Sequence, residues 1–275
     1  MISLTTYPVF CHKLCYFCGC NKIVTRQQHK ADQYLDALEQ EIVHRAPLFA
    51  GRHVSQLHWG GGTPTYLNKA QISRLMKLLR ENFQFNADAE ISIEVHPREI
   101  ELDVPIIYAP ALNRLSMGVQ DFNKEVQRLV NREQDEEFIF ALRAMRDRFY
   151  LHQHRPDLRP AETDAGDRDP ETCGGAQPHR LSVFNYAHLP TIFAAQRKIK
   201  DADLPSPQQK LDILQETIAF LTQLGYQFIG MDHFARPDDE LAVAQREGVL
   251  HRNFQGYTTQ ALIPICWGWA FPPSA

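Results

Sequence analysis

The stretch CHKLCYFCGC, Cys11 to Cys20, decides how this sequence is interpreted. Four of the chain's six cysteines fall within it, whereas Cys173 and Cys266 lie far away. The formal charge of −4 offers no basic field for nucleic acid. The chain shows neither a secretory leader nor the roughly 18 apolar residues of a membrane span. We therefore expect a cytoplasmic, reducing environment, in which clustered cysteines are more often metal ligands than disulfides.

Cys11, Cys15 and Cys18 form a C-x3-C-x2-C run. A tetrahedral zinc site usually draws its ligands from two separated pairs, whereas a [4Fe–4S] cluster normally takes four cysteines. Cys20 could supply a fourth thiolate, but three ligands would leave one iron open to bind a cofactor directly. From the cysteines alone, an iron–sulfur cluster is favoured, and a zinc site or a chance cluster is the alternative.

Hydrophobic periodicity predicts alternating helices and strands, which indicate parallel βα units. The predicted helices cover 31–45, 68–83, 123–131, 135–145 and 206–224, and the predicted strands cover 54–59, 91–95, 114–118, 181–185 and 226–231. Polar features follow three successive strands, namely Gly60–Thr63, Glu94 and Gln120. Each alone would be an ordinary turn or a solvated side chain. Together they predict an active site at the carboxyl ends of the strands.

Two segments do not fit this pattern. Large aliphatic residues are rare between Tyr150 and His179, and the ending ALIPICWGWAFPPSA is apolar without a clear period or caps. We expect no strand or helix of a well-formed barrel in either segment. The predicted organisation is therefore a barrel over 1–260, with 143–179 an irregular insert or out-of-frame stretch, and an unstructured or non-native tail over 261–275.

The cysteine spacing, with Phe17 just before the last ligand, is the signature of radical S-adenosylmethionine (SAM) enzymes. With HWGGGTPTYL, RLSMGVQDFN and LSVFNYAHLP, the sequence resembles the oxygen-independent coproporphyrinogen III oxidases. Cys20 favours these over the related haem-chaperone branch, a carrier without oxidase activity, which is the alternative. The resemblance implies an α/β fold: a partial parallel (β/α) barrel of radical SAM type, incomplete at its C-terminal side.

The resemblance also implies a site. Cys11, Cys15 and Cys18 would hold a [4Fe–4S] cluster, and its open iron would chelate S-adenosylmethionine, of which the family binds two molecules. The implied cofactor-binding residues are Phe17, Gly61, Gly62, Thr63, Glu94, Gln120, Arg132 and Ala187. The implied enzyme is an oxidoreductase of haem biosynthesis that converts coproporphyrinogen III to protoporphyrinogen IX. It would be a monomer that takes electrons from a donor such as a flavodoxin, with no nucleic-acid or membrane partner.

The sequence departs from the family pattern at abrupt breaks. Thr5, Tyr7 and Val9 stand in a lead-in that in the family reads Y-x-H-x-P-F, and His96 replaces an aspartate. PIIYAPAL (105–112) replaces a helix, and 143–179 lacks the expected strand with a cofactor-binding aspartate. The closing segment is absent after 260. These breaks suggest out-of-frame translation or sequencing error, so we expect this chain to convert coproporphyrinogen III poorly.

Overall fold

The structure is a computed structural model that describes residues 1–99, 112–134, 149–155, 178–253, 256–259 and 263–267. The chain divides into two compact units. Unit 1 comprises residues 1–13, 20–115 and 262–275, and unit 2 comprises residues 14–19 and 116–261. The helix predicted over 135–145 and nearly all of PIIYAPAL lie outside the described residues.

Unit 1 is built on parallel strands in the order β13-β1-β4-β5. These strands span Ile263–Trp267, Ile2–Thr6, His53–Trp59 and Gln84–Val95. Every residue of β1 is buried, as expected for a strand with a neighbour on each side and both faces covered. Because parallel strands end at the same edge, Thr6, Trp59 and Val95 mark one edge of the sheet.

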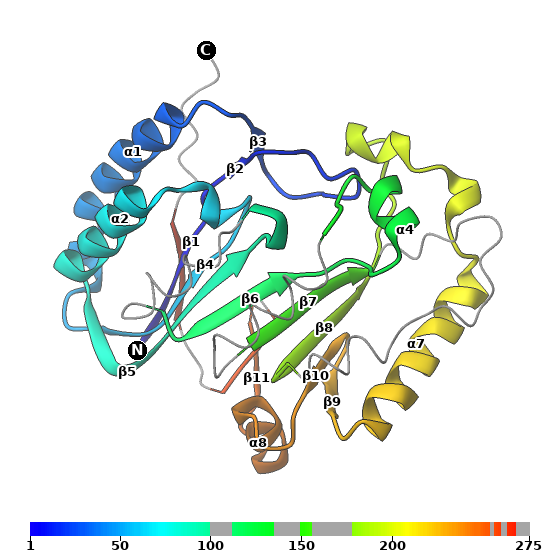
Figure 1. Ribbon diagram of the computed structural model, residues 1–275. Coiled ribbons are helices and arrows are strands. Elements are labelled where there is room, and N and C mark those ends of the chain that lie inside the picture. Colours follow the sequence, from blue (N-terminus) through cyan, green and yellow to red (C-terminus); the bar gives the residue numbers. More distant parts are fainter. Residues whose placement is uncertain (100–111, 135–148, 156–177, 254–255, 260–262, 268–275) are drawn as a thin grey trace. The chain divides into compact units, whose positions relative to one another are not determined.

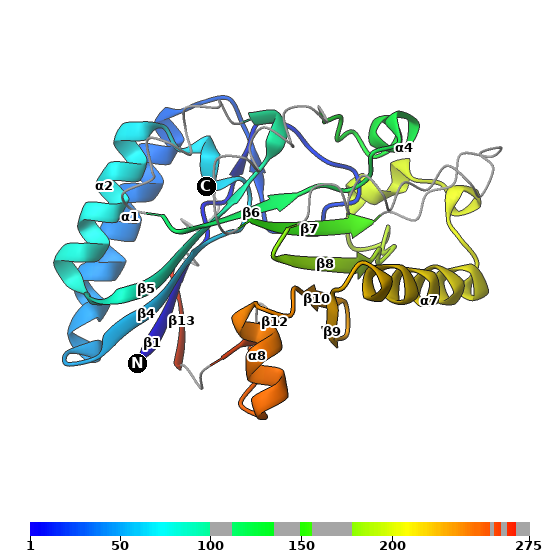
Figure 2. The ribbon, with the colours of Figure 1, turned by 60° about the horizontal axis from the view of Figure 1, so that its bottom comes forward.

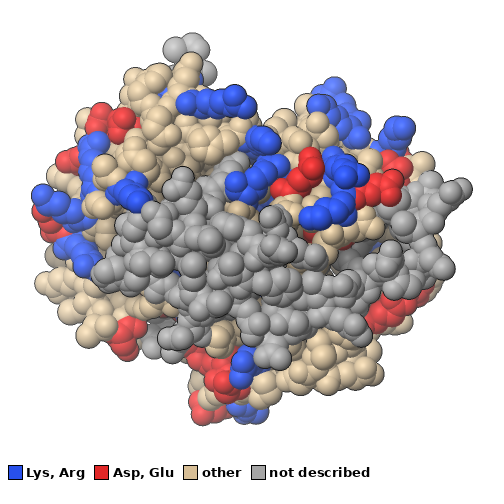
Figure 3. All heavy atoms as spheres, in the orientation of Figure 1, with Lys and Arg blue, Asp and Glu red and all other residues tan. Residues whose placement is uncertain are grey.

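Two helices, α1 (His29–Arg45) and α2 (Lys69–Asn82), lie side by side along these strands (Figures 1 and 2). Each buries the apolar stripe that the sequence predicted: Leu35, Leu38 and Ile42 in α1, and Ile72, Leu75, Met76 and Leu79 in α2. Arg74 of α2 joins the helices through Asp36 and Glu39, at 2.7 and 2.6 Å. Figure 3 likewise shows basic and acidic side chains next to one another on the described part of this face.

Unit 2 contains a parallel pair, β7 and β8, followed by the antiparallel strands β10 and β9. They span Phe149–Arg155, Arg180–Asn185, His233–Ala235 and Gln227–Gly230. The helices are α4 (Lys124–Leu129), α7 (Pro207–Gln223) and α8 (Glu240–Glu247), and β11 (His251–Asn253) pairs with β12 (Gly256–Thr258). β6 (Arg114–Gly118) begins in unit 1 and ends in unit 2.

Short elements complete the described chain. In unit 1, β2 (Phe10–Cys11) pairs in parallel with β3 (Ile23–Val24). Single 3-10 turns are η1 (Ala46–Phe49), η2 (Pro64–Tyr66), η3 (Pro97–Glu99), η4 (Ala194–Lys198) and η5 (Asp201–Asp203). Of the helices that the structure describes, none has the length and apolar character needed to cross a bilayer.

Most predicted elements within the described residues are confirmed. The five predicted strands correspond to β4, β5, β6, β8 and β9, and the four predicted helices to α1, α2, α4 and α7. β6 has the predicted bounds, whereas β5 begins at Gln84, seven residues before the predicted start at Ile91. The division of the chain at residue 260 stays a prediction.

The expectation that 143–179 and 261–275 contain no strand is wrong. β7 (Phe149–Arg155) pairs in parallel with all of β8, and β13 (Ile263–Trp267) pairs in parallel with all of β1. The physical reason is that the hydrogen bonds between paired strands are made by backbone N–H and C=O groups. Every residue except proline supplies both groups, whatever its side chain. β7 begins with the aromatic pair Phe149 and Tyr150, and β13 contains the β-branched Ile263 and Ile265 on either side of Pro264. The composition of the longer segments obscured these strand-favouring residues.

Removal of the N-cap of α2 should lower the stability of unit 1. Asn68 accepts a hydrogen bond from the Gln71 N–H at 3.0 Å, and its own N–H donates to Gln71 Oε1 at 3.0 Å. Asn68→Ala should therefore reduce the free energy of unfolding by about 1 kcal/mol in urea titrations. Asn68→Ser, which keeps a capping oxygen, should stay close to the parent. Equal loss in both variants would contradict this role of the cap.

Candidate functional site

In unit 1 the glycine turn, Gly60–Thr63, binds the segment that leads from β1 to Cys11. The backbone N–H groups of Gly60, Gly62 and Thr63 donate to the carbonyl oxygens of Thr6, Pro8 and Phe10, at 3.0, 2.8 and 2.8 Å. The turn therefore continues the pairing of β4 with β1 beyond the ends of both strands. It holds the backbone on the N-terminal side of Cys11 in a fixed path.

The glycines of this turn are needed because their Cβ positions are occupied by the chain itself. A Cβ on Gly61 would lie 3.0 Å from the Pro8 carbonyl oxygen, and its φ of +106° also disfavours other residues. A Cβ on Gly62 would lie 2.7 Å from the Phe10 carbonyl oxygen. The two glycines therefore let the turn pack closely against the chain's own backbone. Contact of Gly61 and Gly62 with a cofactor stays a prediction.

Cys11 is a buried cysteine next to this turn. The Thr63 hydroxyl donates to its Sγ at 3.5 Å. A donor to sulfur favours the thiolate over the thiol, and the thiolate is the form that binds metal. The centroid of the Tyr66 ring lies 5.2 Å from that of Phe10, on which it stacks, and 4.5 Å from that of His12. Tyr66 therefore contacts the residues that come directly before and after Cys11 in the chain.

Glu94, at the end of β5, is held next to the glycine turn by a histidine. His58 Nε2 lies 3.1 Å from Glu94 Oε1, and His58 Nδ1 lies 2.8 Å from the Ser92 hydroxyl. A Cβ on Gly60 would lie 3.2 Å from the Glu94 carboxyl carbon. The predicted meeting of the turn and Glu94 at one edge of the sheet is therefore confirmed within unit 1. Sequence reasoning missed His58, although its place two residues before the glycines was a usable signal.

In unit 2, residues 14–19 form the cysteine turn, which carries Cys15 and Cys18. Cys15 is buried and Cys18 is half-buried. The Cys18 N–H donates to the Cys15 carbonyl oxygen at 3.3 Å. The loop that follows α4 anchors the turn, since Asn131 Nδ2 donates to the Leu14 carbonyl oxygen at 2.7 Å. The turn is therefore positioned by residues more than 100 positions later in the sequence.

Arg132 connects the cysteine turn to the end of β6. Its guanidinium donates from Nη2 to the Gly118 carbonyl oxygen at 2.8 Å and from Nη1 to Cys15 Sγ at 3.6 Å. The same guanidinium lies 6.0 Å from the centroid of the Phe17 ring. A Cβ on Gly118 would lie only 2.7 Å from Nη2, so a larger residue there would displace the guanidinium. The guanidinium of Arg132 thus lies next to two other predicted site residues, Cys15 and Phe17.

Several buried polar atoms around Gly118 lack a partner among the described residues. They are Gln120 Oε1, Gln134 Oε1 and Arg132 Nε, although Gln134 Nε2 donates to the Gly118 carbonyl oxygen at 2.7 Å. Gln120 is only 2% exposed. A buried polar group without a hydrogen bond costs about 1–3 kcal/mol. These acceptors and this donor therefore suit a polar ligand that carries both N–H or O–H groups and a carboxylate.

Ala187 lies just after β8, between Tyr186 and His188. Burial raises the pKa of the Tyr186 phenol to about 12, so it stays protonated at neutral pH. The phenol lies 2.9 Å from His188 Nδ1, and His188 Nε2 lies 3.2 Å from Asp201. His188 thus links the Tyr186 phenol on one side of Ala187 to Asp201. This chain of hydrogen bonds fixes the backbone on both sides of Ala187.

The predicted site residues fall into two sets. Unit 1 brings together Cys11, Gly61, Gly62, Thr63 and Glu94, and unit 2 brings together Cys15, Phe17, Cys18, Gln120 and Arg132, with Ala187 following β8. Within the described part of the chain, no three His, Cys, Asp or Glu side chains form a ready metal site. That Cys11, Cys15 and Cys18 share one cluster therefore stays a prediction.

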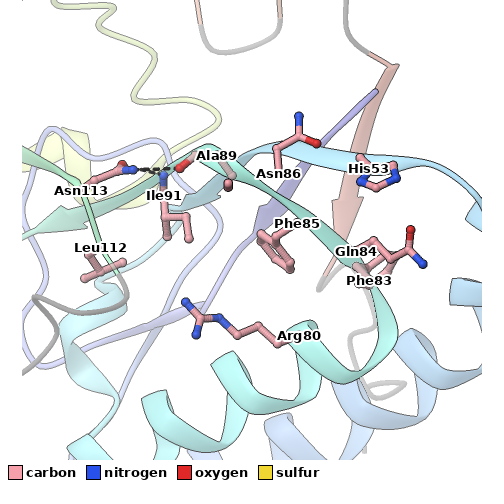
Figure 4. A pocket seen from close by; sticks show the side chains of 11 residues that line it. His53, Arg80, Phe83, Gln84, Phe85, Asn86, Ala89, Ile91, Leu112 and Asn113 are labelled. Carbon is pink, nitrogen blue, oxygen red and sulfur yellow. Dashed lines mark hydrogen bonds between the residues drawn. The ribbon is translucent and has the colours of Figure 1, made fainter.

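A pocket of about 650 Å³ lies in unit 1 around the start of β4 and β5 (Figure 4). Its lining includes His53 and Gln84, the first residues of these strands, together with Arg80 and Phe85. The glycine turn and Glu94 follow the opposite, carboxyl ends of the same strands. This pocket is therefore not the predicted site.

Comparison with known proteins identifies the family. Residues 6–165 match the Radical SAM superfamily. The chain belongs to this superfamily. Membership implies a [4Fe–4S] cluster and S-adenosylmethionine, and it favours the iron–sulfur interpretation of the cysteines over a zinc site.

Curated relatives extend this result. The chain is 80% identical over 270 residues to the oxygen-independent coproporphyrinogen III oxidase of Escherichia coli (strain K12), covering 94% of this chain and 58% of the relative. It is 75% identical over 273 residues to the Salmonella typhimurium protein of the same name. The chain thus spans less than two thirds of these relatives. The resemblance stated from the sequence is confirmed.

Solved structures agree. The E. coli coproporphyrinogen III oxidase HemN, described as a radical SAM enzyme, superposes with a TM-score of 0.88 at 77% identity, over 96% of this chain and 63% of that one. A structure titled native anSMEcpe with bound AdoMet and Kp18Cys peptide shares the fold alone, with a TM-score of 0.56 at 15% identity over 81% of this chain and 60% of that one. The predicted α/β fold, a partial parallel barrel of radical SAM type, is confirmed.

The residues present fit both implied groups. Cys11, Cys15 and Cys18 offer sulfur ligands, and two of them, Cys11 and Cys15, receive a hydrogen bond at sulfur, from Thr63 and from Arg132. Such donors stabilise thiolate ligands of an iron–sulfur cluster. The unpartnered atoms near Gly118 supply both acceptors and a donor for an amino-acid-like cofactor. The chemistry of the donor set therefore agrees with the family.

Gly62→Ala should disturb the backbone before Cys11, because the new Cβ would lie 2.7 Å from the Phe10 carbonyl oxygen. We expect a loss of at least 2 kcal/mol in urea unfolding, as an order-of-magnitude estimate for overpacking. Gly225→Ala is the control: its φ is +87°, but nothing lies within 4 Å of its Cβ position. It should lose only about 1 kcal/mol, the cost of the left-handed backbone. A smaller loss for Gly62→Ala than for Gly225→Ala would refute the steric argument.

Proposed function

We propose that this chain forms the radical SAM part of an oxygen-independent coproporphyrinogen III oxidase. Its reaction is the oxidative decarboxylation of coproporphyrinogen III to protoporphyrinogen IX. The proposed cluster ligands are Cys11, Cys15 and Cys18, and the proposed cofactor-binding residues are Phe17, Gly61, Gly62, Thr63, Glu94, Gln120, Arg132 and Ala187. The observation that carries the proposal is the 80% identity with the E. coli oxidase over 94% of this chain.

When bound, the cluster and S-adenosylmethionine supply reductive cleavage of the sulfonium and hydrogen abstraction from a propionate side chain, which then loses carbon dioxide to become a vinyl group. The chain's own residues would bind and orient the cofactor. Arg132 presents a fixed positive charge next to Cys15 that suits the cofactor carboxylate. Glu94, held by His58, can accept from the cofactor amino group. Gln120 Oε1 can accept from a hydroxyl or an amino group.

Water exclusion is supported by the packing next to the cysteine turn. Val126, Val130, Tyr186 and Ile199 form a buried cluster against which Tyr16 and Phe17 of the turn pack. An apolar floor under the turn keeps water from the reacting groups and strengthens electrostatic interactions there. This environment suits a reaction that must protect a reactive species from solvent.

Several finer expectations remain predictions. They are a second S-adenosylmethionine molecule, an electron donor such as a flavodoxin, a monomeric state, the absence of nucleic-acid and membrane partners, and a cytoplasmic location. Slow turnover of coproporphyrinogen III also stays a prediction. Two of its grounds, the missing strand in 143–179 and the missing closing strand after 260, no longer hold because β7 and β13 are present. The changes at Thr5, Tyr7 and His96 still support it.

Cysteine substitutions test the ligand assignment. After anaerobic reconstitution, Cys11→Ser, Cys15→Ser and Cys18→Ser should each lose the iron–sulfur absorption, because a hard hydroxyl replaces a soft thiolate poorly. Cys20→Ser is the matched control and should keep it, since Cys20 is exposed and the cluster needs only three protein ligands. Loss of the chromophore in Cys20→Ser as complete as in Cys15→Ser would show the three-ligand assignment to be wrong.

The activity test is formation of 5′-deoxyadenosine. The reconstituted chain, incubated anaerobically with S-adenosylmethionine and dithionite, should release 5′-deoxyadenosine, quantified by liquid chromatography. Arg132→Met should lower the yield by roughly tenfold or more, because the substitution removes charge-assisted hydrogen bonds. A reconstituted parent chain that carries four irons and forms no 5′-deoxyadenosine would contradict the proposed chemistry.

A further inference from the structure

The segment Leu189–Lys198, here named the covering segment, lies on the cysteine turn in unit 2. Phe193 covers Gly19: a Cβ on Gly19 would lie 3.1 Å from the Phe193 ring. Lys198 Nζ lies 4.4 Å from the centroid of the Tyr16 ring and donates to its hydroxyl at 3.3 Å. Gly19 and the Tyr16 side chain, both in the turn, are thus contacted by residues about 180 positions away in the sequence.

Between these contacts, one buried amide joins the covering segment to the turn. Gln196 is 2% exposed. Its Nε2 donates to the Phe17 carbonyl oxygen at 2.8 Å, and its Oε1 accepts from the Leu189 N–H at 2.5 Å. A glutamine amide has one acceptor and one donor group, and both are used here. The orientation of this side chain is therefore fixed at both ends.

The carbonyl that Gln196 binds belongs to the peptide bond between Phe17 and Cys18. The N–H of the same peptide bond donates to the Cys15 carbonyl oxygen at 3.3 Å. Because a peptide bond is planar, holding its oxygen and its N–H fixes the plane and with it the position of the Cys18 Cα. Cys15 and Cys18 are the two residues whose backbone carbonyl oxygen and N–H close this hydrogen-bonded turn. Their relative orientation therefore depends on the Gln196 contact.

We propose that Gln196 is a positioning residue for the iron–sulfur cluster, acting through the Phe17–Cys18 peptide to orient Cys18 relative to Cys15. The inference rests on the proposed function, since it takes Cys15 and Cys18 as cluster ligands. Gln196 itself touches neither the sulfurs nor the cofactor-binding residues around Gly118. Its contribution is to hold a ligand in the geometry that the cluster requires, as residues behind metal ligands commonly do.

If Gln196 had a purely structural role, the hydrogen bond from the Leu189 N–H to Gln196 Oε1 would be the important one, because it joins the two parts of the covering segment. Two substitutions separate the roles. Gln196→Glu, at pH 8.5, keeps an acceptor for the Leu189 N–H but cannot donate to the Phe17 carbonyl oxygen and places a negative charge against it. Gln196→Met keeps the volume and loses both bonds. Gln227→Met is the control, because Gln227 donates to the Ala242 carbonyl oxygen and to Gln245, away from the cysteine turn.

The experiment measures the cluster rather than turnover. Parent and variants are reconstituted anaerobically, and iron release to a chelator, the electron paramagnetic resonance spectrum of the reduced cluster and the thermal midpoint are recorded. We expect Gln196→Glu and Gln196→Met to release iron roughly tenfold faster than the parent and to show an altered spectrum. Gln227→Met should match the parent in both cluster readouts, whatever its thermal midpoint.

Each outcome decides a different point. Parent-like iron release and spectrum in Gln196→Glu, with a defect only in Gln196→Met, would overturn the inference, because the bond to Leu189 would then be the one that matters. A defect of equal size in Gln227→Met would also overturn it. A parent chain that takes up no cluster would instead contradict the proposed function and be recognised before any variant is compared.

Discussion

Backbone-to-backbone contact between the glycine turn and the segment before Cys11 is the constraint on which the candidate site in unit 1 depends. Three N–H groups of the turn reach three carbonyl oxygens of that segment, with no space for a side chain between them. This contact continues the parallel pairing of β1 and β4 past the end of the sheet. It delivers Cys11 to the Thr63 hydroxyl and leaves the carboxyl end of β5, with Glu94, next to the turn.

Unit 2 positions its cysteines by side chains instead. Arg132 joins the Gly118 carbonyl oxygen to Cys15, and Gln196 joins Leu189 to the Phe17 carbonyl oxygen. These are long-range contacts that order only when the strand ends and α4 are in place. The arrangement explains why a short sequence motif does not make a cluster site by itself. The motif supplies the thiolates, and distant residues supply their geometry.

The sequence predicted those parts of the fold that have a local cause. The apolar stripe of α2 and its Asn68 cap are local signals, and β6 was predicted at its observed bounds. β7 and β13 were missed because their pairing partners, β8 and β1, stabilise them through backbone hydrogen bonds that composition does not reveal. β1 was not predicted either, although Ile2, Ser3, Leu4 and Thr5 alternate apolar and polar residues.

The candidate site shows the same division. Glycine requirements and ligand cysteines follow from motifs, so Gly62 and Cys15 could be predicted. Gln134 and Gln196 could not, because a buried polar residue is identified by the partner it meets in space. His58 was missed although its place two residues before the glycines was a usable signal. The two tyrosines of unit 2 that flank predicted positions, Tyr16 and Tyr186, likewise acquire their roles through packing and burial.

The central claim is that three cysteines of this chain hold a cluster with one iron open to S-adenosylmethionine. A Mössbauer spectrum of the chain reconstituted with ⁵⁷Fe, recorded before and after addition of S-adenosylmethionine, tests it most directly. The account predicts a [4Fe–4S] spectrum in which one of four iron sites changes its isomer shift when the cofactor is added. A spectrum that S-adenosylmethionine leaves unchanged, or iron bound without a cubane cluster, would contradict it.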